Sequence, residues 1–210
     1  MTYKKIILAS QSPRRSEILQ KASYDFVSIP THVSEILDKN LSGNEQIIDI
    51  ARRKARACWQ LVRDQSLVAT NFDHHTHLIL AADTMVCVDD HVLGKPDDQK
   101  MAFQFLKLLS GRTHQVKTAV HIIDLATSDQ ESLIETTNVS FKILNDSEIL
   151  GYIATGEPMD KAGAYAIQGL GGKLVAGYVG DYNNVVGLPL HAIEKLFKIK
   201  AWTCKRQTHA

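Results

Sequence analysis

The sequence predicts an α/β protein in which short buried strands alternate with helices. Apolar runs at residues 6–9 and 78–82 are typical of buried strands, and residues 116–125 and 133–144 predict two longer strands around a polar turn. Residues 44–63 have the periodicity of an amphipathic helix. The 210 residues are 44% apolar, which is enough for the core of one domain or of two closely joined lobes.

Bulk composition excludes several classes of function. A formal net charge of +1 gives no general electrostatic case for binding nucleic acid or an anionic membrane. The three cysteines, Cys58, Cys87 and Cys204, are odd in number and far apart, so they predict a reducing compartment rather than a disulfide framework. The sequence has no long apolar N-terminal segment and no run of 18 apolar residues. We therefore expect a soluble, cytoplasmic protein without membrane contact.

The first helix begins in an unusual way. Ser12 has the character of an N-cap, and Pro13 suits the first helical position. Arg14 and Arg15 then fall in the first turn, where the helix dipole disfavours cations. Such a start makes sense if an anion binds there, held by backbone N–H groups, serine hydroxyls and guanidinium groups. The alternative is a solvated helix start whose arginines point away.

Two charged residues follow in the next elements. Residues 24–29 predict an extended segment, and Glu35 lies in the polar stretch after it, where an exposed loop carboxylate is the default interpretation. On the helix at 44–63, most basic side chains lie opposite the apolar face, but Lys54 projects inside it. A lysine there must either extend its ammonium group to solvent or meet an anion at the edge of the core.

Asp83 directly follows the buried strand at 78–82. A carboxylate in such an apolar run is costly unless it is hydrogen-bonded, metal-bound or at a cleft. Residues 89–90 predict a two-residue hairpin turn, and the resulting register places Thr84 opposite Lys95. Hairpin geometry therefore predicts that Lys95 lies beside Asp83.

The second half of the chain offers fewer chemical signals. Residues 99–109 predict a capped helix, and a strand at 174–179 precedes a closing helix that ends near residue 199. The dense glycines of residues 155–172 indicate tight backbone bends or close approach of a ligand. Within that stretch Gln168 offers both a donor and an acceptor, as the edge of a base requires.

Histidines allow two further interpretations. His74, His75 and His77 invite a metal site, but without a partner pair at suitable spacing a solvated loop is the expected structure. His114 begins a predicted strand, where a structural hydrogen bond is more common than a catalytic role.

Six motifs, in order along the chain, together resemble the Maf family of nucleoside triphosphate pyrophosphatases. They are Leu8-Ala9-Ser10-x-Ser12-Pro13-Arg14-Arg15, Ala82-Asp83-Thr84, Gly94-Lys95-Pro96, Ser110-Gly111-x-x-His114, Gly156-Glu157-Pro158-x-Asp160-Lys161-Ala162-Gly163-Ala164-Tyr165 and Val185-Val186-Gly187-Leu188-Pro189-Leu190. The resemblance implies an elongated mixed twisted sheet with flanking helices and two lobes around a nucleotide cleft, as in the inosine-triphosphatase group. Residues 1–200 are then one such domain, and residues 201–210 are expected to be a loose tail.

The resemblance also implies hydrolysis between the α and β phosphates of a nucleoside triphosphate, with Mg²⁺ or Mn²⁺ as cofactor. Asp83 would be the general base, and it would share the metal with Glu35. Phosphate binding would fall to four residues: Ser10, Arg15, Lys54 and Lys95. Substrate choice would depend on three residues: Arg14, Thr84 and Gln168.

The segment at 160–169 resembles the branch that acts on dTTP and UTP. Two alternatives stay open at this point. One is a preference for a modified purine triphosphate such as 7-methyl-GTP, and the other is a nucleotide-binding regulator of cell division with little catalysis. The sequence is compatible with a monomer or a homodimer.

Overall fold

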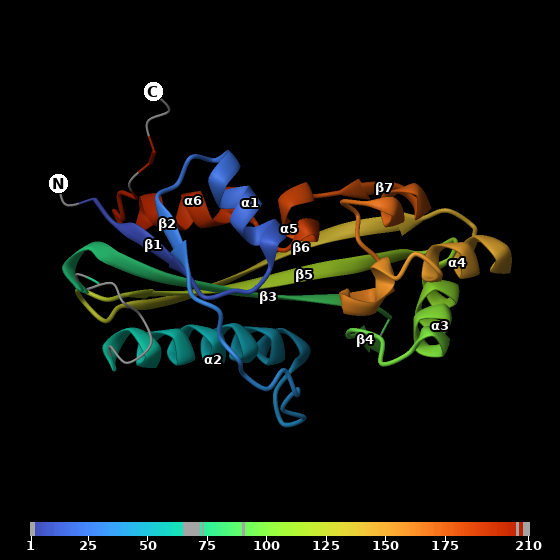
Figure 1. Cartoon of the computed structure of the whole chain (residues 1–210), viewed down its shortest axis with the longest axis horizontal. Helices are drawn as coiled ribbons and strands as arrows, with labels where there is room; N and C mark the ends of the chain where they lie inside the picture. The colour runs from blue at the N-terminus through green and yellow to red at the C-terminus, as the bar shows by residue number, and fades with distance from the viewer. Residues whose placement is uncertain (1–2, 65–71, 73, 90, 205, 208–210) are drawn as a thin grey trace. The chain divides into compact units, whose positions relative to one another are not determined.

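The computed structural model describes residues 3–64, 72, 74–89, 91–204 and 206–207. Within these residues seven strands form one sheet in the order β2-β1-β3-β5-β6-β7, with β4 paired to β3 (Figure 1). The strands are β1 (Lys5–Leu8), β2 (Phe26–Ser28), β3 (His77–Val88), β4 (His91–Leu93), β5 (Thr113–Asp124), β6 (Gln130–Phe141) and β7 (Val175–Val179). Parallel pairs at β1 combine with antiparallel pairs β3–β4 and β6–β7, so the sheet is mixed and the predicted α/β class is confirmed.

Six helices and four short 3₁₀ turns occur among the described residues. The helices are α1 (Pro13–Lys21), α2 (Gly43–Arg63), α3 (Gln99–Leu109), α4 (Asp146–Ile153), α5 (Tyr182–Val186) and α6 (Leu190–Ile199). The 3₁₀ turns are η1 (His74–Thr76), η2 (Glu157–Asp160), η3 (Ala162–Ala164) and η4 (Leu170–Leu174). None of the helices in the described part of the chain is long and apolar enough to cross a membrane.

The chain divides into two compact units. Unit 1 comprises Met1–Asp83, Ala119–Ile134 and Gly187–Ala210, and unit 2 comprises Thr84–Thr118 and Glu135–Val186. The long strands β3, β5 and β6 contribute residues to both units.

In unit 1, α2 covers one face of the sheet, and α1 and α6 cover the other (Figure 1). A capping box fixes the start of α2, where the backbone N–H of Ser42 donates to the Glu45 carboxylate at 3.0 Å. The buried face of α2 packs on alternate residues of the parallel strands, which supplies a core of nine residues: Ile7, Ala9, Ile29, Ala55, Cys58, Val62, Ile79, Ala81 and Ile123. This packing covers the N-terminal half of β3, which leads to Asp83.

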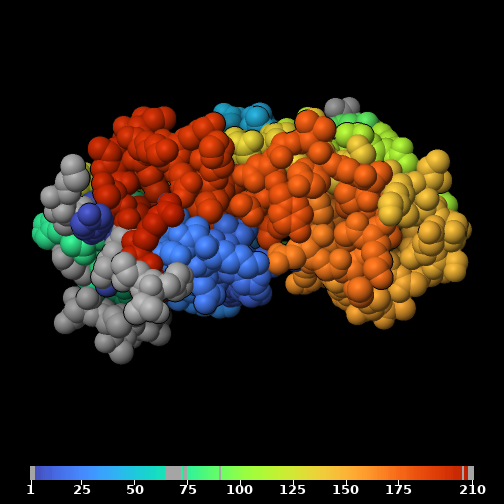
Figure 2. Space-filling model, turned by 90° about the horizontal axis from the view of Figure 1, so that it is seen from above, coloured from blue at the N-terminus to red at the C-terminus, as the bar shows by residue number. Residues whose placement is uncertain are grey.

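The expected C-terminal tail is tied to unit 1 in its described residues. Cys204 forms a parallel β-bridge with Lys4, and Arg206 forms an antiparallel bridge with Tyr24. Figure 2 shows the C-terminal residues, in red, beside the N-terminal ones in blue. Backbone pairing of this kind has no signature in a short polar sequence.

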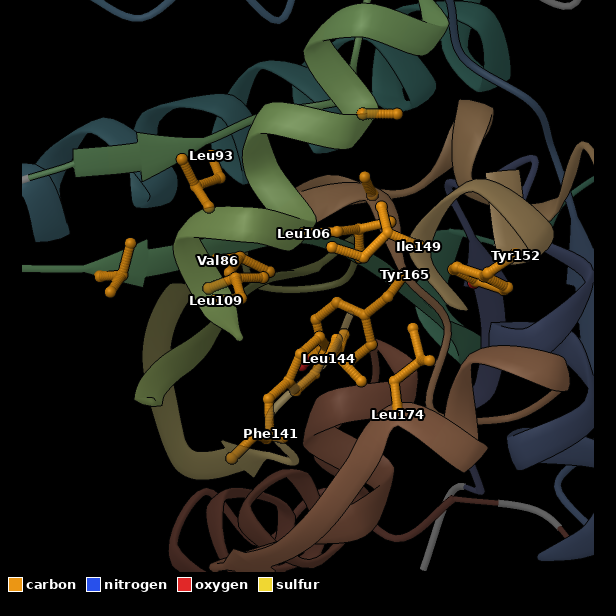
Figure 3. Close-up of a cluster of buried hydrophobic side chains, with 14 of the residues drawn as sticks. Val86, Leu93, Leu106, Leu109, Phe141, Leu144, Ile149, Tyr152, Tyr165 and Leu174 are labelled. Carbon is orange, nitrogen blue, oxygen red and sulfur yellow. The ribbon is translucent and has the colours of Figure 1, made fainter. Parts of the chain in front are cut away.

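In unit 2, α3 and α4 pack on the strands around a large apolar core, part of which is drawn in Figure 3. The cap of α3 is Asp98, whose side chain accepts from the backbone N–H of Met101 at 2.7 Å. Gly111 follows the helix in the left-handed region. Both boundaries of this helix lie where the sequence predicts them.

The hairpin register is confirmed for three pairs, which run from Val88↔His91 to Val86↔Leu93. Of the two predicted turn residues, Asp90 lies outside the described residues. The ladder ends at Leu93, so the predicted pairing of Thr84 with Lys95 is not formed as part of the strand pair.

The predicted solvated loop of histidines is wrong for His77. This residue begins β3, is buried, and packs edge-on against Phe72 with 5.4 Å between ring centroids. Residues 65–71 and 73 lie outside the described part of this stretch.

Candidate active site

Lys54 is the centre of a charged cluster in unit 1. Its ammonium nitrogen lies 2.7 Å from Oδ1 of Asp83 and 2.7 Å from Oε1 of Glu35. The side chains of Lys54 and Asp83 are each 11% exposed, whereas the Glu35 side chain is 43% exposed. Of the two alternatives for Lys54, the structure therefore shows contact with anions at the edge of the core.

Burial explains why these groups must stay together. A buried charge without a partner is strongly unfavourable, and the ammonium group can satisfy two carboxylates because it has three donors. Lys54 reaches them from the apolar side of α2, while Asp83 is fixed by β3. Glu35 is an exposed loop carboxylate, as expected, and it is also ion-paired with Lys54.

Arg15 folds into the same unit beside Ser10. Its Nη1 donates to Oγ of Ser10 at 3.3 Å, and its Nε donates to the carbonyl oxygen of Gly187 at 2.8 Å. Burial lowers the pKa of Arg15, while attraction to Asp83 and Glu35 opposes that shift. The two hydrogen bonds turn the Arg15 guanidinium into unit 1, which contradicts the alternative of a solvated helix start.

Arg14 adds a donor at the start of α1. Its Nε is buried and has no hydrogen-bond partner in the described part of the chain. Ser12 is the N-cap and Pro13 the first helical residue, as predicted, and the first turn contains no acidic residue. Three positive charges, on Arg14, Arg15 and Lys54, face two negative ones. The negative charges are those of Glu35 and Asp83, so the group carries one net positive charge. These features favour a bound anion at this helix start.

Arg53 is a residue of this cluster that the sequence pattern does not reveal. Its guanidinium donates to the carbonyl oxygens of Ser34 and Ile36, on either side of Glu35. Its Nε donates to Asp49 at 2.9 Å. Arg53 thus ties the Glu35 loop to α2. Its only local signal is the i,i+4 spacing from Asp49, which is common on solvated helix faces.

The other three candidate residues belong to unit 2. The Thr84 hydroxyl lies 2.9 Å from the Thr118 hydroxyl. The Thr118 hydroxyl in turn donates to the carbonyl oxygen of Asn184 at 2.9 Å. Thr118 is fully buried, so the hydrogen-bond partner of the Thr84 hydroxyl is held in place by the surrounding core.

Lys95 is exposed in the loop after β4. The preceding residue anchors this loop, because the carbonyl oxygen of Gly94 accepts from the backbone N–H of Gly163 at 3.0 Å. Gly163 has φ +67°, and a Cβ there would lie 2.9 Å from the methyl groups of Val86. That position therefore requires glycine.

Gln168 is exposed in the connection between η3 and η4. The glycines that follow it have a tertiary explanation, and Gly169 in addition has a positive φ of +142°. A Cβ at Gly169 would lie 2.7 Å from Oε2 of Glu157, and a Cβ at Gly171 would lie 2.5 Å from the Tyr152 hydroxyl. The positive φ of Gly156 and Gly163 confirms the interpretation of tight backbone bends. The close approach at Gly169 and Gly171 is by other groups of the protein and not by a ligand.

The structure thus brings together Ser10, Arg14, Arg15, Glu35, Lys54 and Asp83 within unit 1, whereas Thr84, Lys95 and Gln168 lie on unit 2. Across the residues that the structure describes, no group of three or more histidine, cysteine or acidic side chains is placed to hold a metal ion. Glu35 and Asp83 are two carboxylates that share the ammonium group of Lys54.

Comparison with known proteins relates most of the chain to one family. A family profile described as Maf-like protein matches residues 5–199. A dTTP/UTP pyrophosphatase of Bdellovibrio bacteriovorus is 48% identical over 191 residues, which cover 91% of this chain and 96% of that protein. Proteins with the same description from Bacillus velezensis and Thermococcus onnurineus are each 44% identical, over 94% and 91% of this chain and 99% and 95% of their own lengths.

A solved structure of a Vibrio cholerae protein aligns over 74% of this chain and 79% of its own, with 11% identity and a TM-score of 0.33. That likeness is too distant to support an argument.

Proposed function

The chain belongs to the Maf family, and from that premise we propose that it hydrolyses dTTP and UTP to the nucleoside monophosphate and pyrophosphate. The observation that carries the proposal is the buried Asp83–Lys54–Glu35 cluster beside Arg15 and Ser10. It combines a carboxylate fixed on a strand with cations suited to a triphosphate. We further propose that the enzyme sanitises the nucleotide pool.

Phosphate binding is proposed for Ser10, Arg15, Lys54 and Lys95. A triphosphate carries about four negative charges, so positioning and charge neutralisation supply most of the catalysis of its cleavage. The excess positive charge in unit 1 supports this role. Arg15 is already oriented by Ser10 and Gly187, so little conformational entropy is lost when it binds an anion.

Glu35 and Asp83 are proposed to hold Mg²⁺ or Mn²⁺ together with phosphate oxygens. Their chemistry fits, because hard divalent cations prefer carboxylate oxygens and Mg²⁺ is commonly bound by one or two carboxylates plus substrate phosphates. When bound, such a cation neutralises phosphate charge and makes the phosphorus more electrophilic.

Asp83 is proposed as the general base. It would accept the proton of the water that attacks the α-phosphorus, and the bond from that phosphorus to the bridging oxygen would break to release pyrophosphate. Lys54 engages Oδ1 of Asp83 at 2.7 Å and thereby orients the carboxylate. Pyrophosphate is a good leaving group, so the step requires no strong acid.

Arg14, Thr84 and Gln168 are proposed to govern substrate choice. The support for Thr84 is its fixed contact with Thr118, and the support for Gln168 is an amide that offers both a donor and an acceptor. We propose that residues 1–200 act as one two-lobed catalytic domain.

A cytoplasmic location is also proposed, since Cys58, Cys87 and Cys204 are all free thiols, as a reducing compartment maintains them. Light scattering of the purified chain would distinguish a monomer from a homodimer.

The decisive experiment is pyrophosphate release from dTTP, UTP, CTP, GTP and 7-methyl-GTP, each with Mg²⁺ and with EDTA. We expect metal-dependent release of pyrophosphate, fastest from dTTP and UTP. Fastest turnover of 7-methyl-GTP would favour the modified-purine alternative. Nucleotide binding without turnover would favour a regulator and contradict the proposal.

A further inference from the structure

The loop that carries Gln168 is attached to two side chains from outside it. The backbone N–H of Ala166 donates to the Tyr152 hydroxyl at 3.2 Å, just before Gln168. Just after it, the N–H groups of Leu170 and Gly171 donate to the Glu157 carboxylate at 3.0 and 2.9 Å. The two attachment points therefore bracket Gln168 in sequence.

Tyr152 and Glu157 are also joined to each other. The Tyr152 hydroxyl donates to Oε1 of Glu157 at 2.9 Å, so one hydrogen-bonded unit serves both sides of the loop. Burial, followed by the hydrogen bond to Glu157, raises the pKa of Tyr152, and the hydroxyl therefore keeps the proton that it donates.

The carboxylate form of Glu157 suits this arrangement. Burial opposes its charge, but the N–H groups of Gly171 and Leu170 and the Tyr152 hydroxyl hold the pKa of Glu157 below its ordinary value. Both oxygens accept hydrogen bonds, Oε1 two and Oε2 one. A carboxylate can satisfy all three donors, whereas an amide of the same shape presents a donor at one position.

The pair is rigidly supported. Tyr152 lies on α4 and is 5% exposed, with its ring in the core shown in Figure 3. Glu157 begins η2 a few residues later, and its backbone N–H donates to the Thr155 hydroxyl at 3.2 Å. Gly169 and Gly171 let the loop close on these side chains, because a Cβ at either position would overlap them. The loop is thus shaped around the pair.

We propose that Tyr152 and Glu157 are positioning residues for nucleotide selection, which fix the backbone on both sides of Gln168 without contacting the nucleotide themselves. The inference rests on the proposed role of Gln168 in reading the base. Uracil presents an N–H donor and a carbonyl acceptor on the edge where cytosine presents an acceptor and an amino donor. A glutamine distinguishes them only if its amide is held in place, which is what the pair supplies.

The test compares kcat and KM for UTP and CTP in Glu157→Gln and Tyr152→Phe, each alone and combined with Gln168→Ala. We expect each single variant to lower the UTP:CTP ratio of kcat/KM by about tenfold, on the scale of one lost charge-assisted hydrogen bond, and mainly through KM for UTP. In the Gln168→Ala background neither variant should change the ratio further, since its effect passes through Gln168.

A purely structural role would lower kcat for both nucleotides by the same factor and leave the ratio unchanged, which would overturn the inference. Matched controls are Glu148→Gln, which alters a capping carboxylate on α4, and Tyr178→Phe, which alters an exposed ring. Both should keep the wild-type ratio.

The UTP:CTP ratio of kcat/KM also distinguishes failure of the base-reading role of Gln168 from failure of the positioning role of Tyr152 and Glu157. If Gln168→Ala itself leaves the ratio unchanged, the base-reading role of Gln168 is wrong, and the positioning role falls with it. If Gln168→Ala lowers the ratio but Tyr152→Phe and Glu157→Gln do not, only the positioning role is wrong. Tyr152→Phe keeps the ring in the core and carries the test if Glu157→Gln does not fold.

Discussion

Lys54 and Asp83 form a buried ion pair, with 2.7 Å between the ammonium nitrogen and Oδ1. Each side chain is 11% exposed, so neither charge is well solvated without the other. The pair joins the helix α2 to the strand β3 within unit 1, and it links the stability of the fold to the chemistry proposed for the site.

Replacing Lys54 by methionine should lower the free energy of unfolding by about 3 kcal/mol, because Asp83 is left buried without its cation. The double variant Lys54→Met/Asp83→Asn should recover much of that loss. Urea denaturation measures both. The matched control is Lys107→Met, which breaks an exposed pair with Asp146 and should cost less than about 1 kcal/mol. Equal losses in Lys54→Met and Lys107→Met would contradict the buried pair.

Asp83→Asn should retain the fold and nucleotide binding but lower turnover by about 10²-fold or more, the usual scale for a lost general base. Steady-state pyrophosphate release and equilibrium nucleotide binding, measured together, separate chemistry from affinity. Asp146→Asn, which alters an exposed carboxylate, is the control and should leave both unchanged. Near-wild-type turnover of Asp83→Asn would show that Asp83 is not the general base.

Gln168→Ala should weaken the preference for dTTP and UTP more than it slows the reaction, because the amide is proposed to read the base and not to take part in cleavage. Ratios of kcat/KM across pyrimidine and purine triphosphates measure this preference. A uniform loss on every nucleotide would refute a base-reading role.

His114 should make the protein less stable as the pH falls. Burial lowers the pKa of His114 to about 4, from an ordinary value of 6.5, and its Nε2 lies 2.7 Å from the Tyr165 hydroxyl. Between these values the unfolded chain binds a proton at His114 that the folded chain does not, so unfolding becomes easier towards acid. The total effect is roughly 3 kcal/mol, at about 1.4 kcal/mol for each unit of pKa.

The measurement is the slope of unfolding free energy against pH between 6.5 and 4.5. His114→Gln should flatten that slope, whereas substitution of the exposed His91 by glutamine should not. Parallel slopes for His114→Gln and the wild type would show that His114 does not titrate in this way.

Gly163→Ala should destabilise the protein by about 2 kcal/mol, since its backbone has φ +67° and the added Cβ would press on Val86. Thermal unfolding measures the loss. Gly151→Ala is the control, because that glycine lies in α4 with nothing within 4 Å of an added Cβ, and alanine there should stabilise the helix slightly. Similar shifts in both variants would contradict the steric argument.

Local signals in the sequence are sufficient for α2 and α3, whereas α5 is not predicted from the sequence. Both ends of α3 lie where they are predicted, because an N-cap aspartate and a terminal glycine act through neighbouring backbone groups. The strands β5 and β6 are displaced by up to three residues from their predicted positions. Strand ends depend on pairing with other strands, which the local sequence does not specify.

The sequence by itself determined the α/β class, the boundaries of α2 and α3, and the unusual positions of the charged residues Lys54 and Asp83 in apolar surroundings. Hydrophobic periodicity and the cost of a buried charge are both local properties. Only the tertiary structure decided that these two residues meet, that Arg53 secures the loop of Glu35, and that Gly169 and Gly171 make room for Glu157 and Tyr152. These contacts join residues remote in sequence or lie in loops without a regular pattern. Their partners are therefore chosen by how the elements pack.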